Sequence, residues 1–203
     1  IGDSHMAQYY LRAQRLSERE HVNFGMIAKA GWFLFNDQRM GDYARAVKAI
    51  VADKRVHTLV IGSMWGGKIK EAATVRPLLE TRKDLKVYVM LDYPWTPNVG
   101  GQQGIYDPLK HVNRITGDAV GMVQPFPAAD DWKRGNEEIQ RILGDAAEYI
   151  DPTPIVCPGQ KCNLQAWYRD DDHLQPKRIE ADGIWVDRIF EHAAAAESKE
   201  RSR

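Results

Sequence analysis

Two patterns of apolar residues alternate along this chain, and each pattern predicts one kind of secondary structure. Continuous apolar runs, typical of buried strands, are clearest at 56–62 (VHTLVIG) and 85–91 (LKVYVML), with turn-forming residues beyond them. A further strand is predicted over 22–30, and 148–150 (EYI) is expected to end another. These segments predict the strands of a sheet.

Between these runs, apolar residues recur every three or four positions, which predicts amphipathic helices. The predicted helices span 5–19, 40–53, 68–83, 127–147 and 176–195, and the ambiguous pattern within 106–121 fits one short helix. Strands that alternate with helices predict an α/β fold, a three-layer α/β/α sandwich with a mainly parallel central sheet. With 203 residues, the chain is expected to form a single domain over 1–203 with a sizeable core.

The charge balance argues against two classes of partner. The chain has 28 basic and 28 acidic residues, and its formal net charge is +0. It therefore offers neither a basic field for nucleic acid nor an acidic field for a cationic partner. Its apolar runs are too short to span a bilayer, so we expect the chain itself to be soluble.

A short polar motif, Gly2-Asp3-Ser4-His5, stands directly before the first predicted helix. Asp and Ser are both favoured at helix N-caps. A serine there has its oxygen near the positive end of the helix dipole, which suits a nucleophile and the oxyanion formed by its attack. The alternative is an ordinary capping serine. His5 is expected to be structural or to face the substrate, because side chains of neighbouring residues diverge.

A second polar motif, 168–174 (YRDDDHL), lies near the C-terminus. Asp170 and His173 stand three positions apart, so one turn of backbone lets the carboxylate hold the imidazole. Ser4, then Asp170, then His173 is a chain order that can build a nucleophile, an orienting carboxylate and a base. An acidic run alone is more often a solvated loop.

The two cysteines, Cys157 and Cys162, flank a short loop that contains Pro158 and Gly159. Such a loop can close as a disulfide, which is typical of an oxidising compartment. Two buried free thiols are the alternative, and a zinc site would need further ligands nearby. The sequence calls for no metal and no organic cofactor.

Together these motifs resemble the SGNH-hydrolase superfamily of serine esterases and acyltransferases. The stretch DPTP at 151–154, the two cysteines and YRDDDHL narrow the resemblance to the periplasmic SGNH domain fused to membrane acyltransferase-3 proteins. Those proteins O-acetylate cell-envelope polysaccharides such as O-antigen. The resemblance spans essentially the whole chain and is densest at its two ends.

The resemblance implies specific roles for residues of this chain. Ser4 would be the nucleophile, His173 the base and Asp170 the carboxylate that orients it. The oxyanion hole would consist of the backbone N–H groups of Ser4 and Gly31, although Gly31 is equally expected as a plain turn glycine. The family's usual asparagine after the strand at 56–62 is missing, which puts a side-chain donor to the oxyanion in doubt.

Three aromatic residues are candidate sugar contacts. Trp65 follows the strand at 56–62, where ligands bind in open α/β sheets, and either stacks on a sugar face or belongs to the core. Tyr93 and Trp95 lie in the long Pro/Gly-rich loop after 85–91 and either contact the sugar or anchor that loop.

The function implied by the resemblance is transfer of an acetyl group to a hydroxyl of a cell-envelope polysaccharide through an acyl-enzyme. The acetyl donor would be delivered by a membrane acyltransferase-3 domain, and the domain would lie in the periplasm, tethered to the inner membrane by an upstream transmembrane part. Because the sequence has neither a membrane-spanning run nor a signal peptide, the resemblance implies an excised domain. Only Ile1 and Gly2 precede Asp3-Ser4-His5, so we expect either that residues before them are missing or that the first strand is truncated. The alternatives are a carbohydrate acetyl esterase and a glycan-binding module with a vestigial triad.

Overall fold

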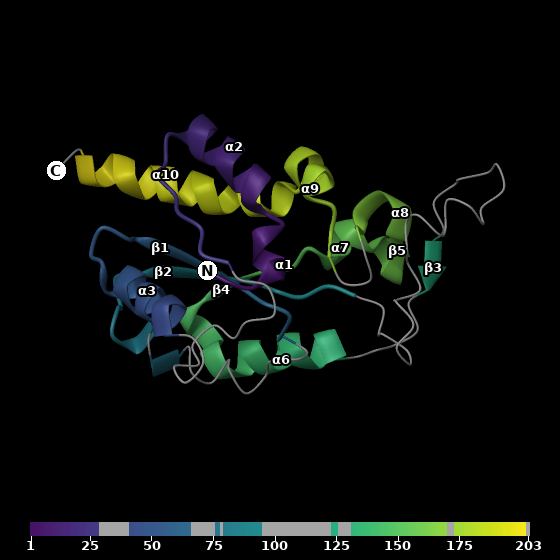
Figure 1. Cartoon of the computed structure of the whole chain (residues 1–203), viewed down its shortest axis with the longest axis horizontal. Coiled ribbons are helices and arrows are strands. Elements are labelled where there is room, and N and C mark those ends of the chain that lie inside the picture. The colour runs from purple at the N-terminus through teal and green to yellow at the C-terminus, as the bar shows by residue number, and fades with distance from the viewer. Residues whose placement is uncertain are drawn as a thin grey trace.

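The protein is built as three layers, with a parallel sheet between two layers of helices (Figure 1). This computed structural model describes residues 1–28, 41–65, 76–77, 79–94, 123–125, 131–169 and 173–201. The helices are α1 (Ser4–Ala7), α2 (Tyr10–Glu20), α3 (Gly41–Ala52), α6 (Asp131–Leu143), α7 (Thr153–Val156), α8 (Leu164–Trp167), α9 (Pro176–Asp182) and α10 (Asp187–Arg201). The strands are β1 (Thr58–Gly62), β2 (Lys86–Met90), β3 (Val123–Pro125), β4 (Glu148–Ile150) and β5 (Lys161–Asn163). The architecture confirms the predicted α/β/α sandwich.

The central sheet has the strand order β1-β2-β4, and all its pairs are parallel. Ile1 and Gly2 continue this sheet beyond β1, because the Gly62 N–H donates to Ile1 O at 3.1 Å and Gly2 bridges both Gly62 and Ala28. The strand predicted over 22–30 is reduced to that bridge within its described part. A separate antiparallel pair, β3 and β5, completes the described strands.

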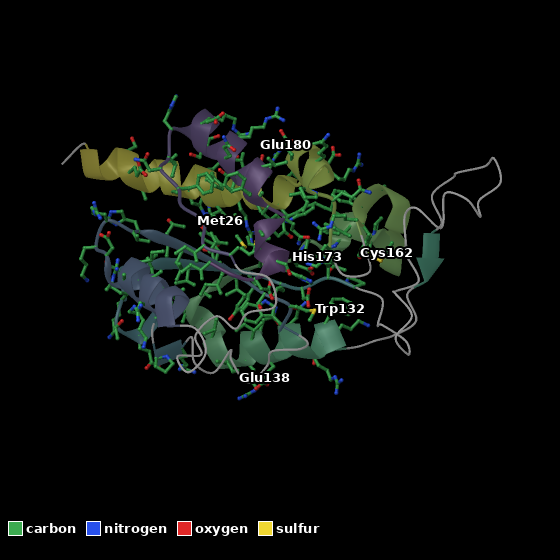
Figure 2. All side chains as sticks on the ribbon, viewed as in Figure 1. Met26, Trp132, Glu138, Cys162, His173 and Glu180 are labelled. Carbon is green, nitrogen blue, oxygen red and sulfur yellow. A yellow bond between two sulfur atoms is a disulfide. The ribbon has the colours of Figure 1, made fainter. Side chains whose placement is uncertain are left out.

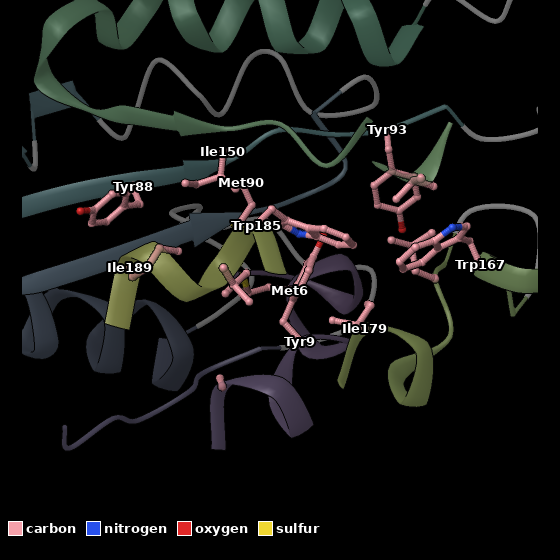
Figure 3. Close-up of a cluster of buried hydrophobic side chains, with 14 of the residues drawn as sticks. Met6, Tyr9, Tyr88, Met90, Tyr93, Ile150, Trp167, Ile179, Trp185 and Ile189 are labelled. Atoms are coloured by element: carbon pink, nitrogen blue, oxygen red, sulfur yellow. The ribbon is translucent and has the colours of Figure 1, made fainter. Parts of the chain in front are cut away.

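Successive side chains of β2 point to opposite faces of the sheet and pack into two separate hydrophobic clusters. Tyr88 and Met90 pack toward α2 and α10, in a cluster that also holds Tyr9 and Trp185 (Figure 3). On the opposite face, Val87 and Val89 of β2 pack with residues of β1, α3 and α6. This second cluster includes Val47, Val51, Leu59, Ile61, Val87, Val89, Ile139 and Leu143. Burial on both faces explains why the strands are continuous apolar runs in the sequence.

Two predicted helices are each divided in the structure. The helix predicted over 5–19 is separated into α1 and α2 around Gln8, whose buried side chain bonds Tyr93 and Leu174. The helix predicted over 176–195 is interrupted at Gly183, where an added Cβ would lie only 2.5 Å from Ile179 O.

The other helix predictions differ mainly at their ends. The helix predicted over 40–53 is confirmed as α3, and the one over 127–147 is α6 followed by a short 3-10 turn. Of the helix predicted over 68–83, the described part is helical at 76–77 and 79–80 and ends in a turn. The segment 106–121 lies outside the described residues.

Arg82 connects the C-terminal end of α3 to the chain that enters β1. Its side chain is 3% exposed and donates to the backbone carbonyls of Val51, Asp53 and Val56. Carbonyls at a helix end have no partner within the helix, so these bonds stabilise the end of α3. Arg82 Nε also donates to Asp84 Oδ1 at 2.9 Å, and this hydrogen bond is the main cause that lowers the pKa of Asp84 from 3.8 to about 2.

This ion pair predicts an acid-dependent part of the stability. Because the pKa of Asp84 is lower in the folded chain, the stabilisation is complete above the unfolded value of 3.8 and is lost as pH falls toward about 2. We therefore expect Asp84→Asn to lower the urea midpoint at neutral pH by a small amount, since Asp84 is half-exposed, and the difference should shrink below about pH 4.

The matched control is Asp145→Asn, because Asp145 is exposed and forms no ion pair with the residues that the structure describes. Its urea midpoint should equal that of the wild type at every pH. A decrease in the Asp84→Asn midpoint that stayed constant down to pH 2 would show that the ionised carboxylate is not its cause.

Candidate functional site

Asp3 fixes the first turn of α1 and connects it to the loop after β1. It is the N-cap of α1, and its Oδ1 accepts the His5 N–H at 2.9 Å. Its Oδ2 accepts the Ser63 hydroxyl at 2.8 Å and the Met64 N–H at 3.1 Å. The cap is therefore Asp3, so the alternative reading of Ser4 as the capping serine is wrong.

Ser4 is the first residue of α1, and its side chain is partly exposed. Neither its Oγ nor its backbone N–H forms a hydrogen bond with another described residue. Both groups are therefore available to a reacting molecule. Because α1 is only four residues long, the helix dipole adds little at Ser4.

The described ends of the C-terminal motif, 168–169 and 173–174, pair with each other as the two arms of a hairpin. Tyr168 and Leu174 form an antiparallel bridge, and the Arg169 N–H donates to His173 O at 2.8 Å. The Leu174 N–H donates to Gln8 Oε1 at 2.7 Å, although these two residues lie 166 positions apart in the sequence. This bond attaches the hairpin that carries His173 to the turn that follows α1.

The hairpin places His173 against α1 (Figure 2). The His173 ring meets the ring of His5 edge to face, with centroids 5.0 Å apart and an angle of 64° between the planes. Because His5 follows Ser4, the structure brings together the two motifs that the sequence singled out. It contains no hydrogen bond between Ser4 Oγ and His173, and such bonds are often loose before a substrate binds.

Three predicted site residues lie outside the described residues: Gly31, Trp95 and Asp170. Their predicted roles therefore remain predictions. They are one donor of the oxyanion hole, one sugar contact and the carboxylate that orients the base.

Two predicted sugar contacts are buried instead. The Trp65 side chain is 1% exposed, and its Nε1–H donates to Met90 O at 2.8 Å within the core. Tyr93 is also 1% exposed, and its ring stacks on His5 with centroids 5.6 Å apart. Neither ring offers a face to a sugar, so Trp65 is a core residue and Tyr93 supports His5.

Asp92 is the main residue of this site that the sequence did not identify. It is 1% exposed, and its Oδ1 lies 3.2 Å from His5 Nδ1. The available signal was its position directly after the strand at 85–91, because ligands bind beyond the carboxyl ends of parallel strands. The contact of Gln8 with the histidine hairpin had no such signal, since a polar residue in a predicted helix is unremarkable.

A disulfide joins Cys157 and Cys162 beside the histidine hairpin. Cys157 Sγ lies 3.5 Å from the Tyr168 hydroxyl, which donates to Pro94 O at 2.5 Å. The Tyr168 ring in turn meets Tyr93 edge to face at 5.9 Å. The disulfide loop therefore packs against Tyr168, which in turn contacts Tyr93 beside His5.

Two cavities flank this part of the structure. One of about 240 Å³ lies between α2, α10 and β1 and is lined mainly by apolar side chains such as Val22, Phe24 and Phe190. The other, of about 10 Å³, is lined by residues of α1, β1 and the end of β2, His5 and Asp92 among them, and has room for about one water molecule. His5 and Asp92 border the smaller cavity, whereas Ser4 and His173 line neither of the two.

The described ranges contain neither a metal site nor a membrane span. Within them, no group of three or more His, Cys, Asp or Glu side chains is placed to hold a metal ion. None of the helices in this part of the chain has both the length and the apolar character that crossing a bilayer requires.

Comparisons with known proteins give the family. No curated protein matches the chain. One similar solved structure is that of the Salmonella ser. Paratyphi A lipopolysaccharide acetyltransferase periplasmic domain, with a TM-score of 0.62 and 10% sequence identity. The match covers 95% of this chain and 81% of that one, and at this identity it supports the fold. The family model for the SGNH domain fused to AT3 domains matches residues 1–177, so this chain belongs to that SGNH family.

Proposed function

We propose that this domain transfers an acetyl group to a hydroxyl of a cell-envelope polysaccharide, through an acyl-enzyme on Ser4. The observation that carries the proposal is the placement of Ser4 and His173. Ser4 Oγ is not used by the fold, and His173 is held against the same turn by a hairpin bonded to Gln8. Membership in the family of SGNH domains fused to AT3 domains, and the likeness to a lipopolysaccharide acetyltransferase domain, support this reading.

The proposed reaction has two steps that use the same groups. Ser4 Oγ attacks the acetyl carbonyl of the donor while His173 takes the serine proton, and His173 then returns that proton to the leaving group. A sugar hydroxyl next gives its proton to His173 and attacks the acetyl-serine carbonyl. His173 then passes this proton to Ser4 Oγ as the acetyl–Ser4 bond breaks, which releases the sugar ester and restores Ser4. Asp170 holds the imidazole, and the N–H groups of Ser4 and Gly31 bind the oxyanion, each such donor being worth about 3 kcal/mol.

The proposed setting follows from the family. We place the chain as one domain of a larger membrane protein whose AT3 domain supplies the acetyl donor, because the matched family is fused to such domains. The domain would then act in the periplasm, tethered to the inner membrane. The Cys157–Cys162 disulfide suits this oxidising compartment.

A carbohydrate acetyl esterase is the second candidate, and one observation favours it. Two of the three aromatic residues expected to bind the acceptor sugar, Trp65 and Tyr93, are buried. Without such a platform, water could resolve the acyl-enzyme as readily as a sugar does. The same burial weakens the third reading, a glycan-binding module, because that function depends on exposed aromatic rings.

The first test of the proposal is Ser4→Ala. We expect wild-type protein to hydrolyse p-nitrophenyl acetate slowly and to be labelled on Ser4 by a fluorophosphonate. Ser4→Ala should lose the labelling and lower the hydrolysis rate by about 10³-fold or more, because the nucleophile is gone. Mass spectrometry of the labelled peptide identifies the modified serine.

The matched control is Ser198→Ala, which removes an exposed serine from α10 and should leave both readouts unchanged. Equal hydrolysis by wild type and Ser4→Ala would contradict a serine nucleophile. To separate transferase from esterase, the acetyl donor is supplied with cell-envelope oligosaccharides. Acetylated oligosaccharide supports the transferase, and free acetate at an unchanged rate supports the esterase.

A further inference from the structure

The site contains a second pair of histidine and carboxylate that the reaction proposed above does not use. His5 is 5% exposed and Asp92 is 1% exposed, and His5 Nδ1 lies 3.2 Å from Asp92 Oδ1. Burying an imidazole and a carboxylate costs free energy that an apolar pair would not. This pair lies directly beside the proposed nucleophile, because His5 follows Ser4 in α1.

The carboxylate of this pair is held from several sides. The side chain of Asn136 in α6 bonds the Asp92 backbone twice, accepting its N–H at 2.7 Å and donating to its carbonyl at 2.8 Å. The Tyr93 N–H donates to Asp92 Oδ1 at 3.1 Å. These bonds fix the direction of the carboxylate at the end of β2.

The His5 ring is equally restrained. One of its faces stacks on Tyr93, with an angle of 13° between the planes, and the Tyr93 hydroxyl is bonded to the side chain of Gln8. An ionised carboxylate can only accept hydrogen bonds, so Asp92 holds the tautomer of His5 that carries its proton on Nδ1. The ring therefore has a fixed plane and a fixed tautomer.

The restrained His5 ring packs against His173, the proposed base. The rings of His5 and His173 meet edge to face, with centroids 5.0 Å apart. The backbone of the His173 hairpin is attached to Gln8, which also bonds Tyr93. One set of contacts thus fixes both imidazole rings relative to each other and to Ser4.

We propose that His5 and Asp92 form a positioning pair for His173. The His5 ring sets the orientation of the His173 ring, and the Asp92 carboxylate stabilises the imidazolium that His173 becomes when it takes the Ser4 proton. The inference deepens the proposed function and rests on it. Neither residue touches the reacting atoms, so both act through His173.

The titratable groups around the two rings make Asp92 the carboxylate to test. Burial raises the pKa values of Tyr9, Tyr93 and Tyr168, so these phenols stay neutral at working pH. Asp3 accepts three hydrogen bonds and is required to cap α1. Asp170 outside the described residues is the proposed orienting group. Among the carboxylates that the structure describes near the two rings, Asp92 is the one that remains, and its partner is His5.

The decisive variant is Asp92→Asn, which keeps the shape of the side chain and an oxygen for His5 while it removes the charge. Because the nearby negative charge favours the protonated form of His173, its loss should shift the acid limb of the kcat/KM profile to lower pH by about one unit. The rate at the plateau should fall about tenfold. A merely structural role would lower the rate without moving the limb.

A second variant, His5→Gln, separates orientation from charge. The glutamine amide can still donate to Asp92, but the aromatic wall against His173 is lost. We expect kcat for p-nitrophenyl acetate to fall about tenfold with KM nearly unchanged and the acid limb in place. The matched control is His57→Gln, which precedes β1 at the opposite end of that strand and should leave the profile unchanged. An unchanged kcat in folded His5→Gln would overturn the orienting role.

An NMR titration of the His173 ring protons distinguishes failure of this inference from failure of the proposed function. It needs no activity, and the midpoint should fall by about one pH unit in Asp92→Asn. If Ser4 is labelled but the midpoint and the limb do not move, the role of Asp92 is wrong. If the midpoint moves but Ser4 is never labelled, the serine mechanism is wrong. If Asp92→Asn does not fold, the kcat of His5→Gln decides whether the pair orients His173.

Discussion

Replacing His173 with alanine is expected to reduce Ser4-dependent ester hydrolysis by about 10³-fold or more, with little change in the folding of the domain. The imidazole is the group placed to take the serine proton, and no other histidine in the described ranges is held by a hairpin against the turn that follows Ser4. Steady-state kinetics with p-nitrophenyl acetate, beside circular dichroism, measures both effects.

Neighbouring carboxylates provide the matched comparison for this prediction. Asp170→Ala should lower the same rate severely, because the base loses its orienting partner, whereas Asp171→Ala should retain the wild-type rate. An Asp171 effect as large as that of Asp170 would contradict the assignment of Asp170. Wild-type hydrolysis by His173→Ala would remove the base itself from the scheme.

The sheet could be predicted from the sequence because its physical signature is local. The strands at 56–62 and 85–91 are buried on both faces, so each is a short run of apolar residues that no amphipathic helix produces. The helix predicted over 40–53 also shows its apolar stripe within its own residues, and α3 was found there. In these segments, the apolar residues whose burial stabilises the element lie close together in the sequence.

The interruption of the first helix could not be predicted in this way, because the residues that Gln8 contacts lie far along the chain. Gln8 ends the first turn through bonds to Tyr93 and to Leu174, which are 85 and 166 positions away. The predictions that Trp65 and Tyr93 contact the sugar were wrong for the same reason. Trp65 follows a strand where ligands bind, but whether an indole there is exposed depends on a carbonyl of β2 to which it bonds.

The pairing of His5 with Asp92 shows the same limit within the site. The sequence does not indicate which residue the His5 ring meets, because Asp92 is 87 positions away. Serine, histidine and the capping aspartate belong to motifs that can be found in a single sequence. The residues that hold them can be found only from the fold.

Gly2→Ala is expected to have the largest effect on the fold of any substitution considered. Gly2 lies between Gly62 and Ala28, bridging both, and its N–H donates to Ile27 O at 2.9 Å. A Cβ at this position would stand 2.0 Å from Gly62 O and 2.4 Å from Met6 Cβ. The first contact is with backbone, so rotation of a side chain cannot relieve it.

Either β1 or α1 must therefore move to accept the methyl group of Gly2→Ala. We expect the free energy of unfolding to fall by about 3 kcal/mol or more, since backbone must shift in a packed interior. Ser4 lies two residues further on and would move with α1, and a displacement of about 1 Å can cost about 100-fold in rate. Urea unfolding and fluorophosphonate labelling of Ser4 measure the two effects. Gly25→Ala is the matched control, because an added Cβ there has no atom within 4 Å and should change neither. Equal stability and labelling of Gly2→Ala and Gly25→Ala would show that the approach of Gly2 to β1 does not set the position of the serine.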